Sequence, residues 1–125
     1  MRPAEDRAED EGYSVEHDPV DGAHLVTAVG ELDLAAAPRL ATVLSMAVEG
    51  PERSVVLDLL PVTFIDSTAL GAIMQASSNC EAADKRMMVV VAEGPVRRLL
   101  EITNLTGRFR LYPDLAAALT VAAKS

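Results

Sequence analysis

The fold of this 125-residue chain is decided in residues 56–71, which read VLDLLPVTFIDSTALG. These residues continue an apolar run, Ser54–Leu59, that is typical of a strand buried on both faces of a sheet. Pro61 ends the run, and the aromatic and aliphatic residues that follow anchor the chain beneath a helix predicted from Ser67 to about Asp84. A buried strand that leads into a helix in this way favours an α/β domain.

Strands and helices alternate on both sides of this stretch. Turn residues at Asp21-Gly22 and Gly50-Pro51 separate the expected elements. The predicted strands cover residues 13–17, 24–29, 54–59, 87–92 and 109–112. The predicted helices begin near Pro38, Ser67, Pro95 and Leu115, and Asp114 caps the last of them. This order predicts an α/β fold in which a small mixed β-sheet of about five strands is flanked by about four helices.

The negative charge is concentrated at the start of the chain. The formal net charge is -8, and residues 1–22 contain eight of the 19 acidic residues but only two of the 11 basic ones. We therefore expect residues 1–12 to be a disordered acidic tail, because the segment has too little apolar surface to offset the entropy of ordering it. The tail is either an interaction arm or a solubilising leader, and residues 13–125 form one domain.

Composition excludes several classes of protein. An acidic chain lacks the positive surface that phosphate backbones require, so we expect no nucleic acid partner. The lone cysteine, Cys80, cannot form an internal disulfide, and no signal segment or long apolar span is present, which indicates a cytoplasmic protein without membrane contact. Cys80 and two scattered histidines give no metal-binding spacing, and no glycine-rich phosphate loop suggests a nucleotide. We expect neither a metal nor a cofactor.

Ser67 has two interpretations at the start of its helix. A serine there is a preferred N-cap, a structural role worth about 1 kcal/mol. The same position also suits a phosphoacceptor, because free backbone N–H groups and the helix dipole would meet the added charge. A partner docked over the turn would be repelled by the phosphate, which would sit beside Asp66.

The first turns of this helix are rich in small residues. They would let a partner approach closely, although tight packing of the helix on the sheet explains them equally well. The candidate contact residues around Ser67 are Asp66, Thr68, Ala69 and Ala72.

Four segments in order along the chain resemble the sulfate transporter and anti-sigma factor antagonist (STAS) family. The resemblance runs from about residue 13 to 124. The segments are Gly30–Asp33, Val56–Leu59, Val62–Gly71 and Pro95–Thr103.

The resemblance implies an anti-sigma factor antagonist that is not itself an enzyme. In this class the unphosphorylated protein binds an anti-sigma factor with serine kinase activity and so releases the sigma factor, and a serine phosphatase resets the switch. The resemblance identifies Ser67 as the phosphoacceptor, with Thr68 in a supporting role, and places Asp33 in a second contact region. Ala69 stands where the family usually has glycine, and its extra methyl group is expected to narrow the choice of partner.

Other interpretations remain open at this point. Within the family, the alternative is a STAS scaffold or transport-complex subunit that packs constitutively. A serine hydrolase is disfavoured because the only histidines, His17 and His24, fall in the early hairpin and no Gly-x-Ser-x-Gly motif is present. Pairing with a second copy as a homodimer is left undecided.

Overall fold

The computed structural model describes residues 12–104 and 109–124. Its elements confirm the predicted mixed α/β order, and all except one short strand over residues 62–65 fall close to their predicted positions. The strands are β1 (Tyr13–Val20), β2 (Ala23–Leu32), β3 (Ser54–Asp58), β4 (Val62–Ile65), β5 (Arg86–Val90) and β6 (Phe109–Tyr112). The helices are α2 (Ala37–Glu49), α3 (Ser67–Ala82), α4 (Pro95–Thr103) and α5 (Leu115–Ala123).

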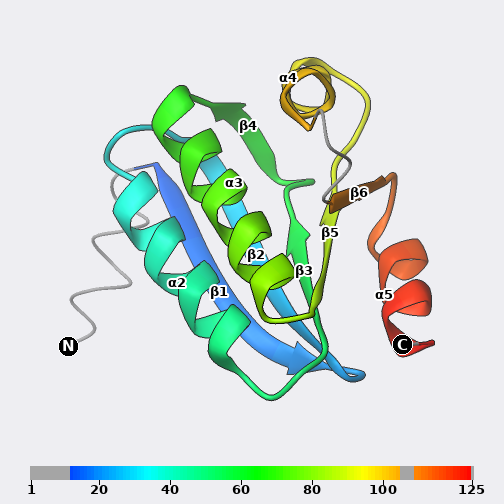
Figure 1. Ribbon diagram of the computed structural model, residues 1–125. Helices are drawn as coiled ribbons and strands as arrows, with labels where there is room; N and C mark the ends of the chain where they lie inside the picture. The colour runs from blue at the N-terminus through cyan, green and yellow to red at the C-terminus, as the bar shows by residue number, and fades with distance from the viewer. Residues whose placement is uncertain (1–11, 105–108, 125) are drawn as a thin grey trace, which may run out of the picture.

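The six described strands form one mixed sheet in the order β1-β2-β3-β5-β6, with β4 paired to β2 off this path. Only β1 runs antiparallel to its neighbour, and the other pairs are parallel. The carboxyl ends of β2, β3, β4 and β5 therefore point to the same end of the sheet (Figure 1). Helix α3 begins at that end, which places Ser67 beside the loops that follow the strands.

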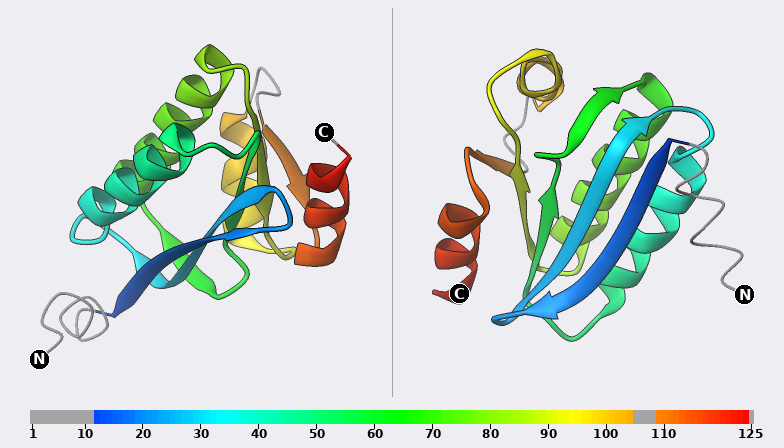
Figure 2. Two further views of the ribbon diagram at one scale, coloured as in Figure 1. Left: turned by 90° about the horizontal axis from the view of Figure 1, so that it is seen from below. Right: turned by 180° about the vertical axis from the view of Figure 1, so that it is seen from behind.

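Helices cover the two faces of the sheet unequally. Helices α2 and α3 pack side by side on one face, over a core that includes Leu40, Val55, Leu57 and Ile73 (Figures 1 and 2). Helix α5 covers part of the other face, where Ala118 packs in a smaller apolar cluster. All five residues of β3 are buried, as the continuous apolar run predicted. Within the described residues, no helix is long and apolar enough to span a bilayer.

Two details of the sheet differ from the sequence-based prediction. Strand β2 does not end at Gly30 but continues to Leu32, with a register shift between Gly30 and Glu31. Gly30 has a φ of +93°, and a Cβ there would lie 2.0 Å from the Gly12 carbonyl oxygen. Only glycine therefore fits at this point of the strand.

The acidic tail expected over residues 1–12 lies outside the described residues except for Gly12.

The stretch after Pro61 is a sixth strand, where the sequence indicated only an anchor. Val62 and Ile65 of β4 are buried, but Phe64 is 48% exposed. The anchor is therefore aliphatic, and the aromatic ring faces outward. Strand β4 pairs with the extension of β2, which brings the start of α3 next to the loop after β2.

Candidate functional site

Two acidic residues meet at the carboxyl end of β2 and β4. Leu32 pairs with Ile65 in the sheet, so the residues that follow them, Asp33 and Asp66, leave adjacent strand ends. The backbone N–H of Asp66 donates to the Leu32 carbonyl at 3.0 Å and fixes the two loops against each other. The structure therefore joins the Asp33 loop and the Ser67 turn, which are more than thirty residues apart in the chain.

Asp66, rather than Ser67, caps helix α3. Its backbone is extended, and its Oδ1 atom accepts hydrogen bonds from the backbone N–H groups of Thr68 and Ala69, each at 3.0 Å. The hydroxyl of Thr68 donates to the same oxygen at 2.6 Å. Ser67 is the first residue inside the helix, so the interpretation of Ser67 as the N-cap is wrong. Asp66, at the preceding position, is the N-cap residue.

Ser67 is exposed and the capping bonds do not involve its hydroxyl. The amides predicted to meet a phosphate are already occupied, because those of Thr68 and Ala69 bond to the Asp66 side chain and that of Leu70 bonds to the Asp66 carbonyl. A phosphate on Ser67 would add charge next to an existing carboxylate. The second hydroxyl of the turn, on Thr68, is held by Asp66 and supports the cap.

Hydrogen bonding lowers the pKa of Asp66. The Thr68 hydroxyl contributes most, the Ala69 N–H contributes next, and burial opposes them. Since these bonds stabilise the ionised form, the carboxylate is charged at neutral pH. The turn that presents Ser67 therefore already bears one negative charge.

The Asp66 cap predicts a pH-dependent stability. Because the folded-state pKa is lower than the unfolded one, the contribution of the cap is present at neutral pH and is lost as the pH falls through the folded-state value. We expect Asp66→Ala to lower the urea midpoint at pH 7, whereas Asp66→Asn retains most of the cap. Denaturation from pH 7 to pH 2.5 measures the effect. Asp66→Asn should lose less stability than wild type in acid, and parallel curves would contradict the assignment.

Two residues expected to touch a partner occupy different environments. Ala69 is fully buried and belongs to the main core, so its side chain cannot contact a docked protein. Ala69 is therefore not a direct partner contact, because its methyl group packs beneath the helix. Ala72 is half-buried and packs against the same core, while Thr68 is exposed.

Asp33 has a structural role in its loop. Its Oδ1 atom accepts hydrogen bonds from the N–H groups of Ala35 and Ala36 at 3.1 and 3.2 Å, which forms the turn into α2. Asp33 therefore stabilises the turn between β2 and α2. The side chain remains partly exposed, next to the Asp66 turn.

Two exposed apolar side chains near the turn were missed from the sequence. Leu34, directly after Asp33, is 70% exposed, and Phe64, two residues before Asp66, is 48% exposed. Each could have been noticed as a large apolar residue flanking a polar turn, but pattern alone does not show which of them face solvent. Exposed apolar groups that adjoin a polar turn are typical of an interaction surface.

Both histidines lie far from Ser67. His24 is the second residue of β2, and Asp33 directly follows the last residue of that strand. The length of the strand therefore separates His24 from Asp33 by about 30 Å. His17 contacts His24 and lies at the same remote end. Neither ring can serve Ser67 as a general base, which removes the basis of the serine hydrolase interpretation.

The geometry is that of a STAS domain. The STAS family model matches residues 14–118, and the chain belongs to this family. The protein is similar to the anti-sigma-B factor antagonist of Staphylococcus aureus, with 32% identity over 76 residues, which cover 61% of this chain and 70% of that protein. The name of this relative describes an antagonist of an anti-sigma factor.

Solved structures support the same assignment. An anti-sigma factor antagonist from Mycobacterium paratuberculosis superposes with a TM-score of 0.80 at 28% identity, covering 90% of this chain and 95% of that one. The antagonist SpoIIAA in its unphosphorylated form gives a TM-score of 0.71 at 15% identity, over 90% of this chain and 99% of that one. At that identity, the likeness to SpoIIAA concerns the fold.

Proposed function

We propose that this protein is an anti-sigma factor antagonist switched by phosphorylation of Ser67. The unphosphorylated form binds an anti-sigma factor that is also a serine kinase and thereby releases a sigma factor. Phosphorylation ends the binding, and a serine phosphatase restores it. The observation that carries the proposal is the exposed Ser67 at the first residue of α3, beside the ionised Asp66 whose Oδ1 atom caps the helix.

The arrangement of charge explains how a phosphate would act. A phosphate adds about -1.5 to -2 charges at neutral pH. At many helix N-termini free amides neutralise such a group, but here the Asp66 side chain occupies the amides of Thr68 and Ala69. The added charge would remain directed at solvent or at a docked partner. The switch would therefore be electrostatic and would not require a change in fold.

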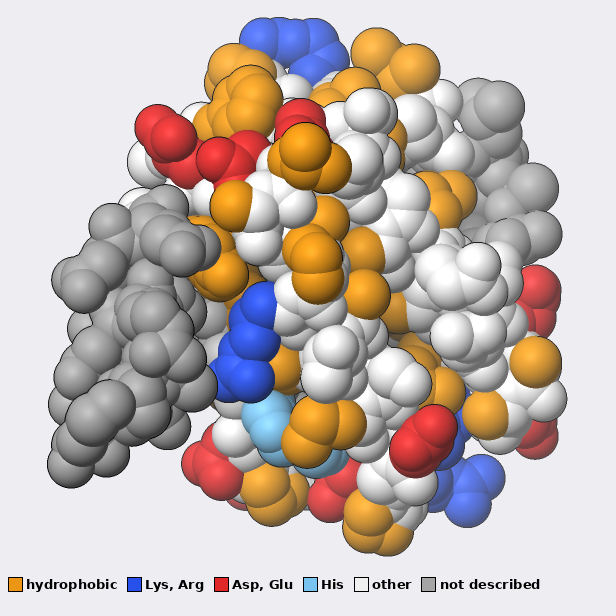
Figure 3. All heavy atoms as spheres, turned by 90° about the vertical axis from the view of Figure 1, so that its left-hand side faces the viewer, with side chains coloured by type: hydrophobic (Ala, Val, Ile, Leu, Met, Phe, Trp, Pro, Cys, Tyr) orange, Lys and Arg blue, Asp and Glu red, His pale blue; other side chains and the backbone are white. Residues whose placement is uncertain are grey.

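The surface beside Ser67 suits a docked protein. Residues 40–48 of α2 and 67–80 of α3 include no charged side chain. Seen from the side of α2, charged groups lie mainly toward the edges of the surface and its middle is mostly apolar or uncharged (Figure 3). Leu34 and Phe64 add exposed apolar area next to the turn. A partner that binds this surface would desolvate few charged side chains of the protein. It would, however, lie directly against any charge added to Ser67.

The proposal is tested by incubating the protein with its anti-sigma kinase and ATP. We expect one phosphate per chain, located on Ser67 by mass spectrometry. Ser67→Ala should abolish the incorporation, and the matched variant Thr68→Val should retain it. Undiminished phosphorylation of Ser67→Ala would contradict the proposal. Stable partner binding with no phosphate transfer would instead favour the constitutive STAS scaffold.

A further inference from the structure

The two histidines form a hydrogen-bonded chain with a glutamate at the end of the sheet remote from Ser67. His17 Nδ1 lies 2.8 Å from His24 Nε2, and His24 Nδ1 lies 2.9 Å from Glu52 Oε1. The two rings are stacked, with centroids 5.0 Å apart. His24 is buried and His17 is exposed. The chain links β1, β2 and the turn between α2 and β3.

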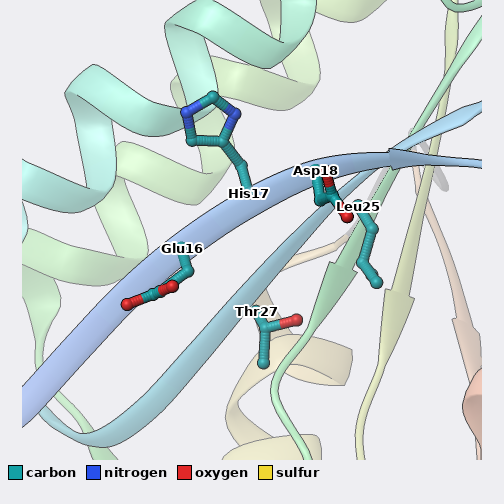
Figure 4. Close-up of a pocket in the computed structure, with 5 residues that line it drawn as sticks. All are labelled: Glu16, His17, Asp18, Leu25 and Thr27. Atoms are coloured by element: carbon teal, nitrogen blue, oxygen red, sulfur yellow. The ribbon is translucent and has the colours of Figure 1, made fainter.

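The hydrogen bonds determine where the protons reside when both rings are neutral. A carboxylate only accepts, so His24 donates from Nδ1 to Glu52 and its Nε2 atom is left to accept from His17. The hydrogen bond from His24 is the main cause that lowers the pKa of Glu52, which keeps this carboxylate charged at neutral pH. Figure 4 shows the His17 ring raised toward α2, with Leu25 and Thr27 on the other side of β1.

We propose that Glu52, His24 and His17 form a pH-sensitive latch, which fastens the β1–β2 hairpin to the α2–β3 turn at neutral pH and loosens in mild acid. A first added proton leaves both hydrogen bonds in place, because either ring can donate across the contact between His17 Nδ1 and His24 Nε2. A second added proton places N–H against N–H and two positive rings 5.0 Å apart. Histidine is the side chain that generally changes charge between pH 5 and 8, which sets the range of the test.

Other charged groups lie on each of the elements that pack around the latch. From the α3–β5 turn, Lys85 donates to the carbonyls of Val48 and Gly50, and its positive charge also acts on Glu52. From α2, Arg39 donates to the Val15 carbonyl, two residues from His17. Further charged groups on the same elements are exposed, namely Glu16, Asp18, Asp21, Glu49 and Arg53. Glu52 is therefore the only carboxylate recorded in hydrogen-bond contact with either ring among the described residues.

The turn between α2 and β3 packs closely against His24 and Glu52 at Gly50. A Cβ at Gly50 would lie 2.9 Å from Glu52 Oε1 and 3.2 Å from His24 Nδ1. Glycine at this position allows the loop to pack against the ring. The latch thus depends on backbone shape as well as on the three side chains.

The test compares hydrogen exchange of wild type and His17→Gln at pH 7.5 and 5.0, as protection factors corrected for intrinsic rates, with EDTA present to exclude metal ions. A glutamine side chain both donates and accepts, so it can pair with His24 in either protonation state. In wild type we expect hairpin amides to lose roughly tenfold more protection in acid than α3 amides lose. In His17→Gln this excess loss should disappear.

Nitrogen-15 spectra of the histidine rings provide a second measurement. At pH 7.5 the wild-type His24 should be the Nδ1–H tautomer, and Glu52→Gln should weaken that preference. Equal pH dependence of the hairpin in wild type and His17→Gln would overturn the latch. A His24 ring with its proton on Nε2 at pH 7.5 would overturn it as well.

Discussion

Ser67→Asp is expected to weaken binding to the anti-sigma partner by about tenfold or more, whereas Ser67→Ala binds as tightly as wild type. The aspartate places a negative charge next to the ionised Asp66, in a contact that otherwise receives a small neutral side chain. Each tenfold change in affinity corresponds to about 1.4 kcal/mol, which a single uncompensated charge readily supplies. Titration calorimetry with the purified partner measures the difference.

A matched control on the same helix separates position from charge. Asn79→Asp adds the same charge at an exposed site twelve residues further along α3, about 18 Å away. We expect this variant to bind nearly as well as wild type. If Ser67→Asp and Asn79→Asp lost affinity equally, the loss would come from the overall charge of the protein. That result would contradict a specific role for Ser67 in partner binding.

Ile73→Ala is expected to lower the free energy of unfolding by about 2–5 kcal/mol. Ile73 is fully buried in the main core and fixes α3, and with it the Ser67 turn, on the sheet. Removing its side chain leaves a cavity that close packing cannot fill. Chemical denaturation measures the loss, and the exposed Gln75→Ala on the same helix is the control, with a change within about 0.5 kcal/mol. Equal stabilities would contradict the packing of α3.

The order of the elements could be predicted because their apolar patterns are local. The continuous run through Ser54–Asp58 and the helical spacing after Ser67 do not depend on distant partners. The burial of Ala69 also had a local signal, since it lies in helical phase with Ile73, Ala76 and Cys80. The small size of Ala69 also fits a contact surface, so the sequence alone does not decide between burial and contact.

Strand β4 and the identity of the cap could not be predicted, because both depend on tertiary contacts. Strand β4 is four residues long and its burial does not alternate, so no period marks it. Asp66 and Ser67 are both good N-cap residues. The choice between them follows from the pairing of β4 with β2 and the bond from Asp66 to the Leu32 carbonyl. The contact between His24 and Glu52 spans 28 residues and leaves no local pattern either.

The most direct test of the switch is the affinity of one protein sample for its anti-sigma partner before and after enzymatic phosphorylation. Mass spectrometry should first locate the phosphate on Ser67. The account predicts that the phosphorylated sample binds at least about tenfold more weakly, and that treatment with a serine phosphatase restores the original affinity. Equal affinity of the two forms would contradict it.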